Sequence, residues 1–398
     1  MKIVICNTLY PPDGIGGPER SVKITAEGLV RLGHDVTVIG QGLSFKSGSA
    51  NINGVKRISI GSPPGYEPVV ADNRGKVRSL KKRLFSPIAF DLLARYEELI
   101  AAEHPDVVHT NVVHSMDKLW ERLHARSLPV VHTVRIYNLM CNERMFFQGA
   151  ECRTQCTFCK KRFSARIESS NKVSAVVGIS RYVLQRHLDE GYFADGPKKF
   201  VIGNPYDIDD SVTVSRNSSA QRSNKLLFMG RIHPSKGVRV FASLAKNSPS
   251  PLLSYRICGR GHEDYEAEIR TVLQGTPTEW LGFSSHAEAF DSVEWLVVPS
   301  AWGEPFGRVV IEAFAHGIPV IASSRGAFPE LIQHGKNGFL FSPDDPQSLS
   351  DIARGIAEGR FDYDQMRGHA LRSAEEFSAQ SIATHYQSTY EAVLRKNV

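Results

Sequence analysis

The sequence has no long hydrophobic run and little cysteine. No stretch approaches the about 20 consecutive apolar residues that a membrane-spanning helix requires, which predicts a cytoplasmic or peripheral protein. The apolar run Lys2 to Cys6 is too short for a signal-peptide core and has no cleavage site behind it, so we interpret it as a first strand. Six cysteines in such a chain argue against structural disulfides.

A dinucleotide fingerprint is also missing. The first strand is not followed by Gly-x-Gly-x-x-Gly, because Gly14, Gly16 and Gly17 do not fit that spacing. This absence argues against an oxidoreductase. The sequence also has no internal repeat and no low-complexity tract.

What is present is the composition of a folded protein of more than one domain. The chain has 398 residues, 41% hydrophobic and 23% charged. Domains of about 100 to 200 residues predict two cores with a cleft between them. The net charge of +6 suits phosphate-bearing ligands, anionic lipid or simple solubility, and does not choose among them.

Short β-branched runs alternate with helical stretches along the chain. This alternation predicts an α/β fold of two doubly wound, Rossmann-like domains with ligands at the carboxyl ends of parallel strands. The expected parts are an N-terminal domain over 1–210, a Ser/Asn-rich linker over 211–224, a C-terminal domain over 225–375 and a final helix over 376–398 that packs back on the N-terminal domain.

The segment from Glu304 to Glu312 follows a predicted strand and opens a helix. Unbonded N–H groups at a helix start favour a diphosphate, here from Phe306, Gly307, Arg308 and Val309. Glu304 precedes the helix, where it can accept hydrogen bonds from sugar hydroxyls, and Glu312 shares a face with Arg308 and can accept from a ribose. Alternatively, both glutamates are ordinary solvated carboxylates.

A second segment adds two cations at the same predicted sheet edge. Arg231 and Lys236 lie between Gly230 and Gly237 after the first strand of the second domain. Arginine binds phosphate oxygens bidentately and lysine binds as a point charge. The alternative is a solvated basic turn, which the flanking glycines make the weaker reading.

In these motifs the chain resembles glycosyltransferase family 4, a nucleotide-sugar-dependent group with the GT-B fold. The N-terminal half carries the resemblance more weakly than the C-terminal half. The matching pieces are Gly16-Gly17-Pro18-Glu19, Gly33-His34, Asp106–His109, Asn204-Pro205, Gly230-Arg231, Lys236-Gly237, Gly259–Gly261, Leu281–Phe283, Val298–Ser300, Glu304–Gly307, Glu312–Ala315, Gly317–Val320 and Pro329-Glu330.

The resemblance implies roles for individual residues. Arg231 and Lys236 would hold the donor diphosphate, Glu304 would orient the sugar and Glu312 would hold the ribose. The N–H groups of Gly16 and Gly17 would approach the phosphate from the other domain, unless they form only a tight turn. The reaction would be a retaining transfer that needs no metal ion.

The resemblance also implies an acceptor that is a glycan or is lipid-linked, in cell-envelope polysaccharide or glycoconjugate synthesis. A sugar-nucleotide epimerase or a phosphorylase would share the architecture, since a fold does not fix a function. A zinc-containing nucleic-acid-binding protein is a third reading. It is disfavoured because one cysteine cluster interrupts an enzyme-like domain, so no nucleic-acid partner is expected.

His132 resembles the family histidine that lies near the reacting sugar. Many members with a nearby cysteine motif carry a His-Asp pair a few residues later, where this chain has Arg135-Ile136. His132 therefore either takes over that role or is a core histidine at a strand end.

Two further features are not explained by the donor site. Four thiols, Cys141, Cys152, Cys156 and Cys159, suit a structural zinc ion, or they pack a loop in reduced form. Residues 76–85 combine five cations with apolar side chains and could bind an anionic membrane surface on its cytoplasmic face, at about 1 kcal/mol per cation. An ordinary solvated basic helix is the alternative.

Overall fold

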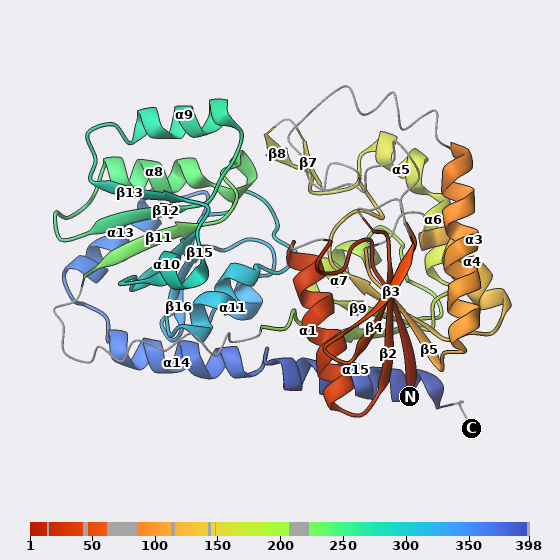
Figure 1. Cartoon of the computed structure of the whole chain (residues 1–398). Helices are drawn as coiled ribbons and strands as arrows, with labels where there is room; N and C mark the ends of the chain where they lie inside the picture. The colour runs from red at the N-terminus through yellow and green to blue at the C-terminus, as the bar shows by residue number, and fades with distance from the viewer. Residues whose placement is uncertain are drawn as a thin grey trace. The chain divides into compact units, whose positions relative to one another are not determined.

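The computed structural model describes residues 1–13, 16–42, 47–61, 86–112, 116–141, 145–147, 149–206 and 223–395. The chain divides into two compact units, which are visible in Figure 1. Unit 1 comprises Met1–Met145, Thr154–Pro205 and Ala379–Val398, and unit 2 comprises Phe146–Arg153 and Tyr206–Ser378. The basic segment 76–85 and residues 211–222 of the expected linker lie outside the described residues.

Unit 1 is built on a parallel sheet with one antiparallel edge. In the part of the chain that the structure describes, the strand order is β10-β9-β6-β5-β1-β2-β4-β3, and only β3 and β4 run antiparallel. The central strands are buried along their length, as expected for a sheet covered on both faces. The strands are β1 (Lys2–Cys6), β2 (Asp35–Gly40), β3 (Gly48–Ile52), β4 (Val55–Ser59), β5 (Val107–Thr110), β6 (Val130–Val134), β9 (Ala175–Gly178) and β10 (Lys198–Val201).

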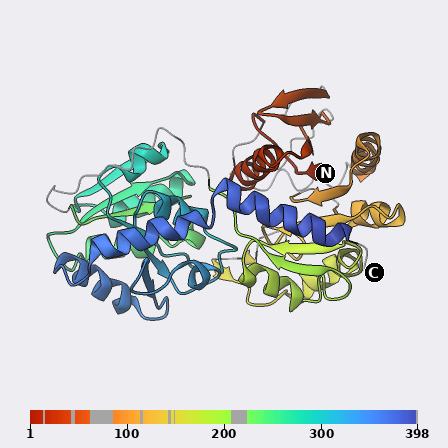
Figure 2. The ribbon, with the colours of Figure 1, turned by 90° about the horizontal axis from the view of Figure 1, so that it is seen from below.

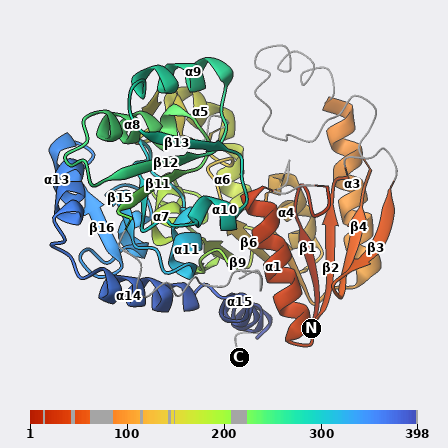
Figure 3. The ribbon, with the colours of Figure 1, turned by 60° about the vertical axis from the view of Figure 1, so that its left-hand side comes forward.

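The helices of unit 1 bring the two ends of the chain together. Figures 2 and 3 show α15 beside α1, and a Cβ added at Gly28 of α1 would lie 2.8 Å from the Cβ of Ala383 in α15. The glycine thus allows the two helices to pack closely. The helices are α1 (Gly17–Arg31), α3 (Ser86–Glu103), α4 (Met116–Ala125), α5 (Thr157–Phe163), α6 (Ala165–Ser170), α7 (Arg181–Leu188) and α15 (Ala379–Leu394).

Unit 2 is doubly wound. Its sheet is parallel with the order β13-β12-β11-β14-β15-β16, so the strand order reverses between β11 and β14. The strands are β11 (Lys225–Met229), β12 (Ser254–Cys258), β13 (Thr278–Gly282), β14 (Trp295–Val298), β15 (Val320–Ser323) and β16 (Gly338–Phe341). The connecting helices are α8 (Val238–Lys246), α9 (Glu263–Val272), α10 (His286–Phe290), α11 (Arg308–Ala315), α12 (Phe328–Leu331), α13 (Pro346–Ala357) and α14 (Tyr363–Glu375), with a 3-10 turn at Pro234–Lys236.

A short hairpin from the N-terminal half of the sequence also belongs to unit 2. Strands β7 (Phe146–Phe147) and β8 (Ala150–Glu151) pair antiparallel, with Phe146 opposite Glu151. The predicted N-terminal domain, 1–210, included this hairpin, whereas the structure groups it with unit 2. The predicted fold class, two doubly wound α/β domains, is confirmed.

Candidate functional site

The candidate site lies where the strand order of unit 2 reverses. Two loops leave the carboxyl ends of neighbouring strands there: the basic loop (Gly230–Gly237) after β11 and the glutamate loop (Ala301–Gly307) after β14. In open α/β sheets this switch point is where ligands bind. The N–H of Ala301 donates to the carbonyl of Ser235 at 2.9 Å, so the two loops are joined.

A glycine sets how close these loops come. Gly237 has φ of +69°, and a Cβ added there would lie 1.7 Å from the carbonyl oxygen of Pro299. No side chain fits in that space. The glycine therefore holds Lys236 directly beside the loop that carries Glu304.

Lys236 and Glu304 form an ion pair at the centre of the site. Lys236 Nζ lies 2.6 Å from Glu304 Oε2, and Trp302 Nε1 donates to the same oxygen at 3.0 Å. The Glu304 side chain is 14% exposed and that of Lys236 is 31% exposed, so the pair is held in place but open to a ligand. The structure brings together a cation suited to phosphate and a carboxylate suited to sugar hydroxyls.

Glu312, on α11, is the centre of a second cluster of charged side chains. The carboxylate is largely buried, with Oε1 lying 3.4 Å from Arg308 Nη2 and Oε2 lying 3.4 Å from His286 Nε2. The Arg308 contact follows from the i, i+4 spacing. His286 belongs to α10, and no sequence signal pointed to it.

The start of α11 lacks a side-chain cap. Gly307 occupies the N-cap position with φ of +96°, and no side chain caps the first turn. Phe306 is buried and packs edge-on against Phe377 at 5.6 Å, so this segment presents backbone rather than an aromatic ring. The uncapped helix end favours an anion. Arg231 lies exposed in the basic loop.

In unit 1, the expected glycine pair begins α1. Gly16 is the N-cap and Gly17 is the first residue of the helix, and the carboxylate of Glu19 accepts a hydrogen bond from the Gly16 backbone. Burial raises the pKa of Glu19, while the charge of Arg135 lowers it. A carboxylate thus already sits at the helix end that was expected to face a phosphate.

His132 has the surroundings of a core histidine. Its Nδ1 lies 3.0 Å from Thr110 Oγ1, and its ring packs edge-on against Trp120 at 4.7 Å and stacks on Phe193 at 5.7 Å. Burial lowers its pKa to about 3, so the ring stays neutral at working pH. Its role at the reacting sugar stays a prediction, and these contacts favour the structural alternative.

Arg135 lies directly after β6, three residues beyond His132. It is buried, with Nε donating to Asn111 Oδ1 at 2.8 Å and Nη1 donating to Asn204 Oδ1 at 2.5 Å. Burial lowers its pKa. Two side-chain amides thus hold the guanidinium at the end of β6.

Acid is expected to destabilise unit 1 through its buried histidines. Burial lowers the pKa of His132 to about 3, that of His187 to about 4 and that of His109 well below its ordinary value. In the unfolded chain each of these histidines has a pKa of about 6.5. Between about pH 6.5 and 4 the unfolded state therefore binds more protons. The free energy of unfolding therefore decreases as the pH is lowered through this range. Each histidine contributes up to about 1.4 kcal/mol per pH unit.

Urea unfolding at pH 7 and at pH 5 measures this slope. His132→Phe keeps an aromatic ring but removes one proton site, so its stability should depend less on pH than that of the wild type. His262→Asn, at an exposed position, is the control and should leave the slope unchanged. Equal slopes for wild type and His132→Phe would show that His132 does not remain neutral in the folded protein.

The cysteine cluster is divided between the two units. The thiols of Cys141, Cys156 and Cys159 hydrogen-bond in unit 1, whereas Cys152 belongs to unit 2. Burial raises the pKa of Cys159 to about 12. Among the described residues, no three His, Cys, Asp or Glu side chains are arranged to hold a metal ion. Structural zinc at the four thiols therefore stays a prediction.

Two other features bear on the site. No helix among the described residues is long and apolar enough to cross a membrane, and membrane contact through 76–85 stays a prediction.

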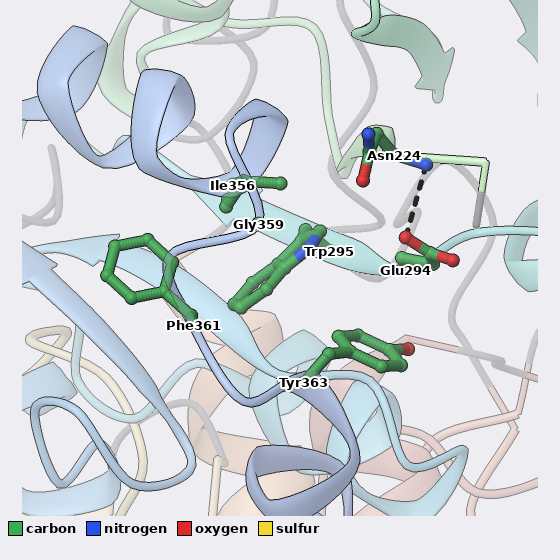
Figure 4. Close-up of a pocket in the computed structure, with 7 residues that line it drawn as sticks. All are labelled: Asn224, Glu294, Trp295, Ile356, Gly359, Phe361 and Tyr363. Carbon is green, nitrogen blue, oxygen red and sulfur yellow. Dashed lines mark hydrogen bonds between the residues drawn. The ribbon is translucent and has the colours of Figure 1, made fainter.

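Figure 4 shows a pocket at the amino ends of β11 and β14, lined by Asn224, Glu294 and Trp295 among others. Its volume of about 10 Å³ suits about one water molecule. It is therefore not the site for a sugar nucleotide.

Comparison with known proteins identifies relatives over most of the chain. The family described as glycosyl transferases group 1 matches residues 212–370, and glycosyltransferase family 4 matches residues 15–210. A 42.6 kDa protein in the cps region of Klebsiella pneumoniae is 29% identical over 356 residues, which cover 88% of this chain and 92% of the relative.

A second relative and a solved structure extend the likeness. The lipopolysaccharide core biosynthesis mannosyltransferase LpsB of Rhizobium meliloti is 24% identical over 73% of this chain and 86% of its own. Anabaena HepE, solved in complex with UDP and glucose, matches with a TM-score of 0.68 at 18% identity. That match covers 98% of this chain and 100% of HepE, and it shows a shared fold.

Proposed function

The chain belongs to the group 1, family 4 glycosyltransferases, and we propose that it transfers a sugar from a nucleotide-diphosphate sugar to a glycan or lipid-linked acceptor. One observation carries the proposal: Lys236 and Glu304 meet at 2.6 Å, at the switch point of a doubly wound sheet. This ion pair supports the proposal that one cation binds the diphosphate and one carboxylate binds the sugar at the same site.

The proposed reaction breaks the bond between the sugar and the diphosphate. The diphosphate leaves with the electron pair, the acceptor hydroxyl bonds to the sugar on the same face, and its proton passes to the departing phosphate. Negative charge grows on the diphosphate, where Lys236, Arg231 and the uncapped start of α11 stabilise it. Glu304 accepts from sugar hydroxyls, and Glu312 accepts from the ribose. We propose no metal ion in this step.

The relatives support a donor and an acceptor class. HepE was solved with UDP and glucose, which favours a nucleotide-sugar donor for this chain as well. LpsB is named for lipopolysaccharide core biosynthesis, which favours a role in cell-envelope polysaccharide synthesis. Retention of the donor's anomeric configuration is the stereochemistry expected for this family.

A thermal-shift panel of UDP-, GDP-, ADP- and TDP-sugars tests the proposal. A donor that binds only the folded protein at about 100 times its Kd adds about 2.7 kcal/mol of stability. One donor class should raise the melting temperature and then release its nucleoside diphosphate when an acceptor is added. No shift with any donor would contradict the proposal, and phosphate-dependent turnover would indicate a phosphorylase.

A further inference from the structure

The hairpin formed by β7 and β8 contacts both loops of the candidate donor site. The ring of Phe146 packs edge-on against His233 of the basic loop, with 6.1 Å between ring centroids. Glu151 reaches the glutamate loop: its Oε1 accepts a hydrogen bond from the N–H of Gly303 at 2.6 Å. All of these residues belong to unit 2, although the hairpin comes from the first half of the sequence.

Glu151 is held in this position by a cation. Its Oε2 lies 3.7 Å from Arg325 Nη1, and the same nitrogen donates to the carbonyl of Ala301 at 3.3 Å. The Glu151 side chain is 18% exposed, so water competes little for its oxygens. Hydrogen bonds in which one partner is charged and partly buried are stronger than neutral ones.

The glutamate loop is clamped from its other side by backbone. The N–H of Ala327 donates to the carbonyl of Glu304 at 3.0 Å, and a Cβ added at Gly326 would lie 2.3 Å from the nitrogen of Glu304. Gly303 and Glu304 thus run between Gly326-Ala327 and the carboxylate of Glu151. Gly303 has no side chain to pack, and its N–H is bound by the Glu151 carboxylate.

From this geometry we propose that Glu151 is a positioning residue for Glu304, and that the hairpin is a part of the donor site. The inference rests on the proposed function. Glu151 fixes the backbone one residue before Glu304, and so fixes where the Glu304 carboxylate meets Lys236 and the sugar. Catalytic groups must be held to about 0.5 Å, and a 1 Å error costs about 100-fold in rate.

Steady-state kinetics of three variants test this role. Glu151→Ala should lower kcat by about 10- to 100-fold, with a smaller change in the KM of the donor, because the loop is misplaced but the diphosphate contacts remain. Glu151→Gln keeps an oxygen that can accept from Gly303 and should retain most of the activity. Asp344→Asn is the matched control, since Asp344 pairs with the same Arg325 at 3.3 Å but is 85% exposed.

Several outcomes would overturn the role of Glu151. Wild-type kcat in Glu151→Ala would refute positioning, and a raised kcat would show instead that the hairpin obstructs the site. Equal losses in Glu151→Gln and Asp344→Asn would assign the effect to the charge balance of Arg325. Should Glu151→Ala fail to fold, Glu151→Asp keeps the charge but shortens the reach by one methylene, and it should show the same loss.

The proposed function is tested separately in the same experiment. Wild-type protein that turns over no donor refutes the transferase activity. Wild-type turnover that is indifferent to Glu151→Ala refutes only the positioning role.

Discussion

Replacing Glu304 with alanine is expected to lower the rate of sugar transfer by about 100-fold or more while leaving the fold intact. Its carboxylate lies 2.6 Å from Lys236 Nζ and 3.0 Å from Trp302 Nε1. These two contacts fix the carboxylate at the place that we propose for the sugar. Removal of a preorganised group from such a place raises the barrier without removing any buried apolar contact.

Lys236→Ala should produce a loss of similar size, because the departing diphosphate loses a fixed cation. Since the two side chains contact each other, the double variant should lose less than the product of the single losses. Asp351→Ala, which breaks an exposed ion pair with Arg354 on α13, is the control and should leave turnover unchanged. Near-wild-type turnover in both single variants would refute the proposed site.

Gly237→Ala is expected to reduce both stability and activity, and Gly359→Ala is its matched control. The two glycines have almost the same backbone, with φ of +69° and +68°. At Gly359 nothing lies within 4 Å of an added Cβ, whereas at Gly237 the Cβ would lie 1.7 Å from the carbonyl oxygen of Pro299. The space around the added Cβ is the difference that this pair of variants tests.

The left-handed backbone alone should cost each variant about 1 to 2 kcal/mol. Gly237→Ala should cost about 1 to 3 kcal/mol more, because the basic and glutamate loops must separate to admit the methyl group. Urea unfolding measures the free energies, and donor turnover shows whether Lys236 has moved. Equal destabilisation by the two variants would show that the loops are not in tight contact at Gly237.

The sequence predicted the parts of the site that depend on local order along the chain. Alternating strands and helices placed Lys236 and Glu304 after neighbouring parallel strands, and such loops meet at one edge of the sheet. The i, i+4 spacing likewise predicted the contact between Arg308 and Glu312. These relations follow from strand direction and helix geometry, which periodicity reveals.

Contacts between distant segments could not be predicted in this way. His286 reaches Glu312 from another helix, and Glu151 reaches Gly303 across a long stretch of sequence. Each depends on how elements pack rather than on local spacing. Strands of two residues, as in β7 and β8, are also too short to produce a periodic signal.

One missed element did carry a signal. Asn53-Gly54 joins β3 to β4 with φ of +51° and +84°, and Ile52 pairs with Val55. An Asn-Gly pair between two strands is a strong indication of a two-residue hairpin turn. The antiparallel edge of unit 1 could therefore have been predicted.

The central claim is that the carboxyl edge of the unit 2 sheet binds the diphosphate of the donor. Calorimetric titration tests this claim most directly. The ligand is the nucleoside diphosphate of the donor that the thermal-shift panel identifies, and its affinity is measured for the wild type, Arg231→Ala and Lys236→Ala. We expect each variant to bind at least about 10-fold more weakly, since about 1.4 kcal/mol of charge-assisted contact is lost. Unchanged affinity in both variants would contradict it.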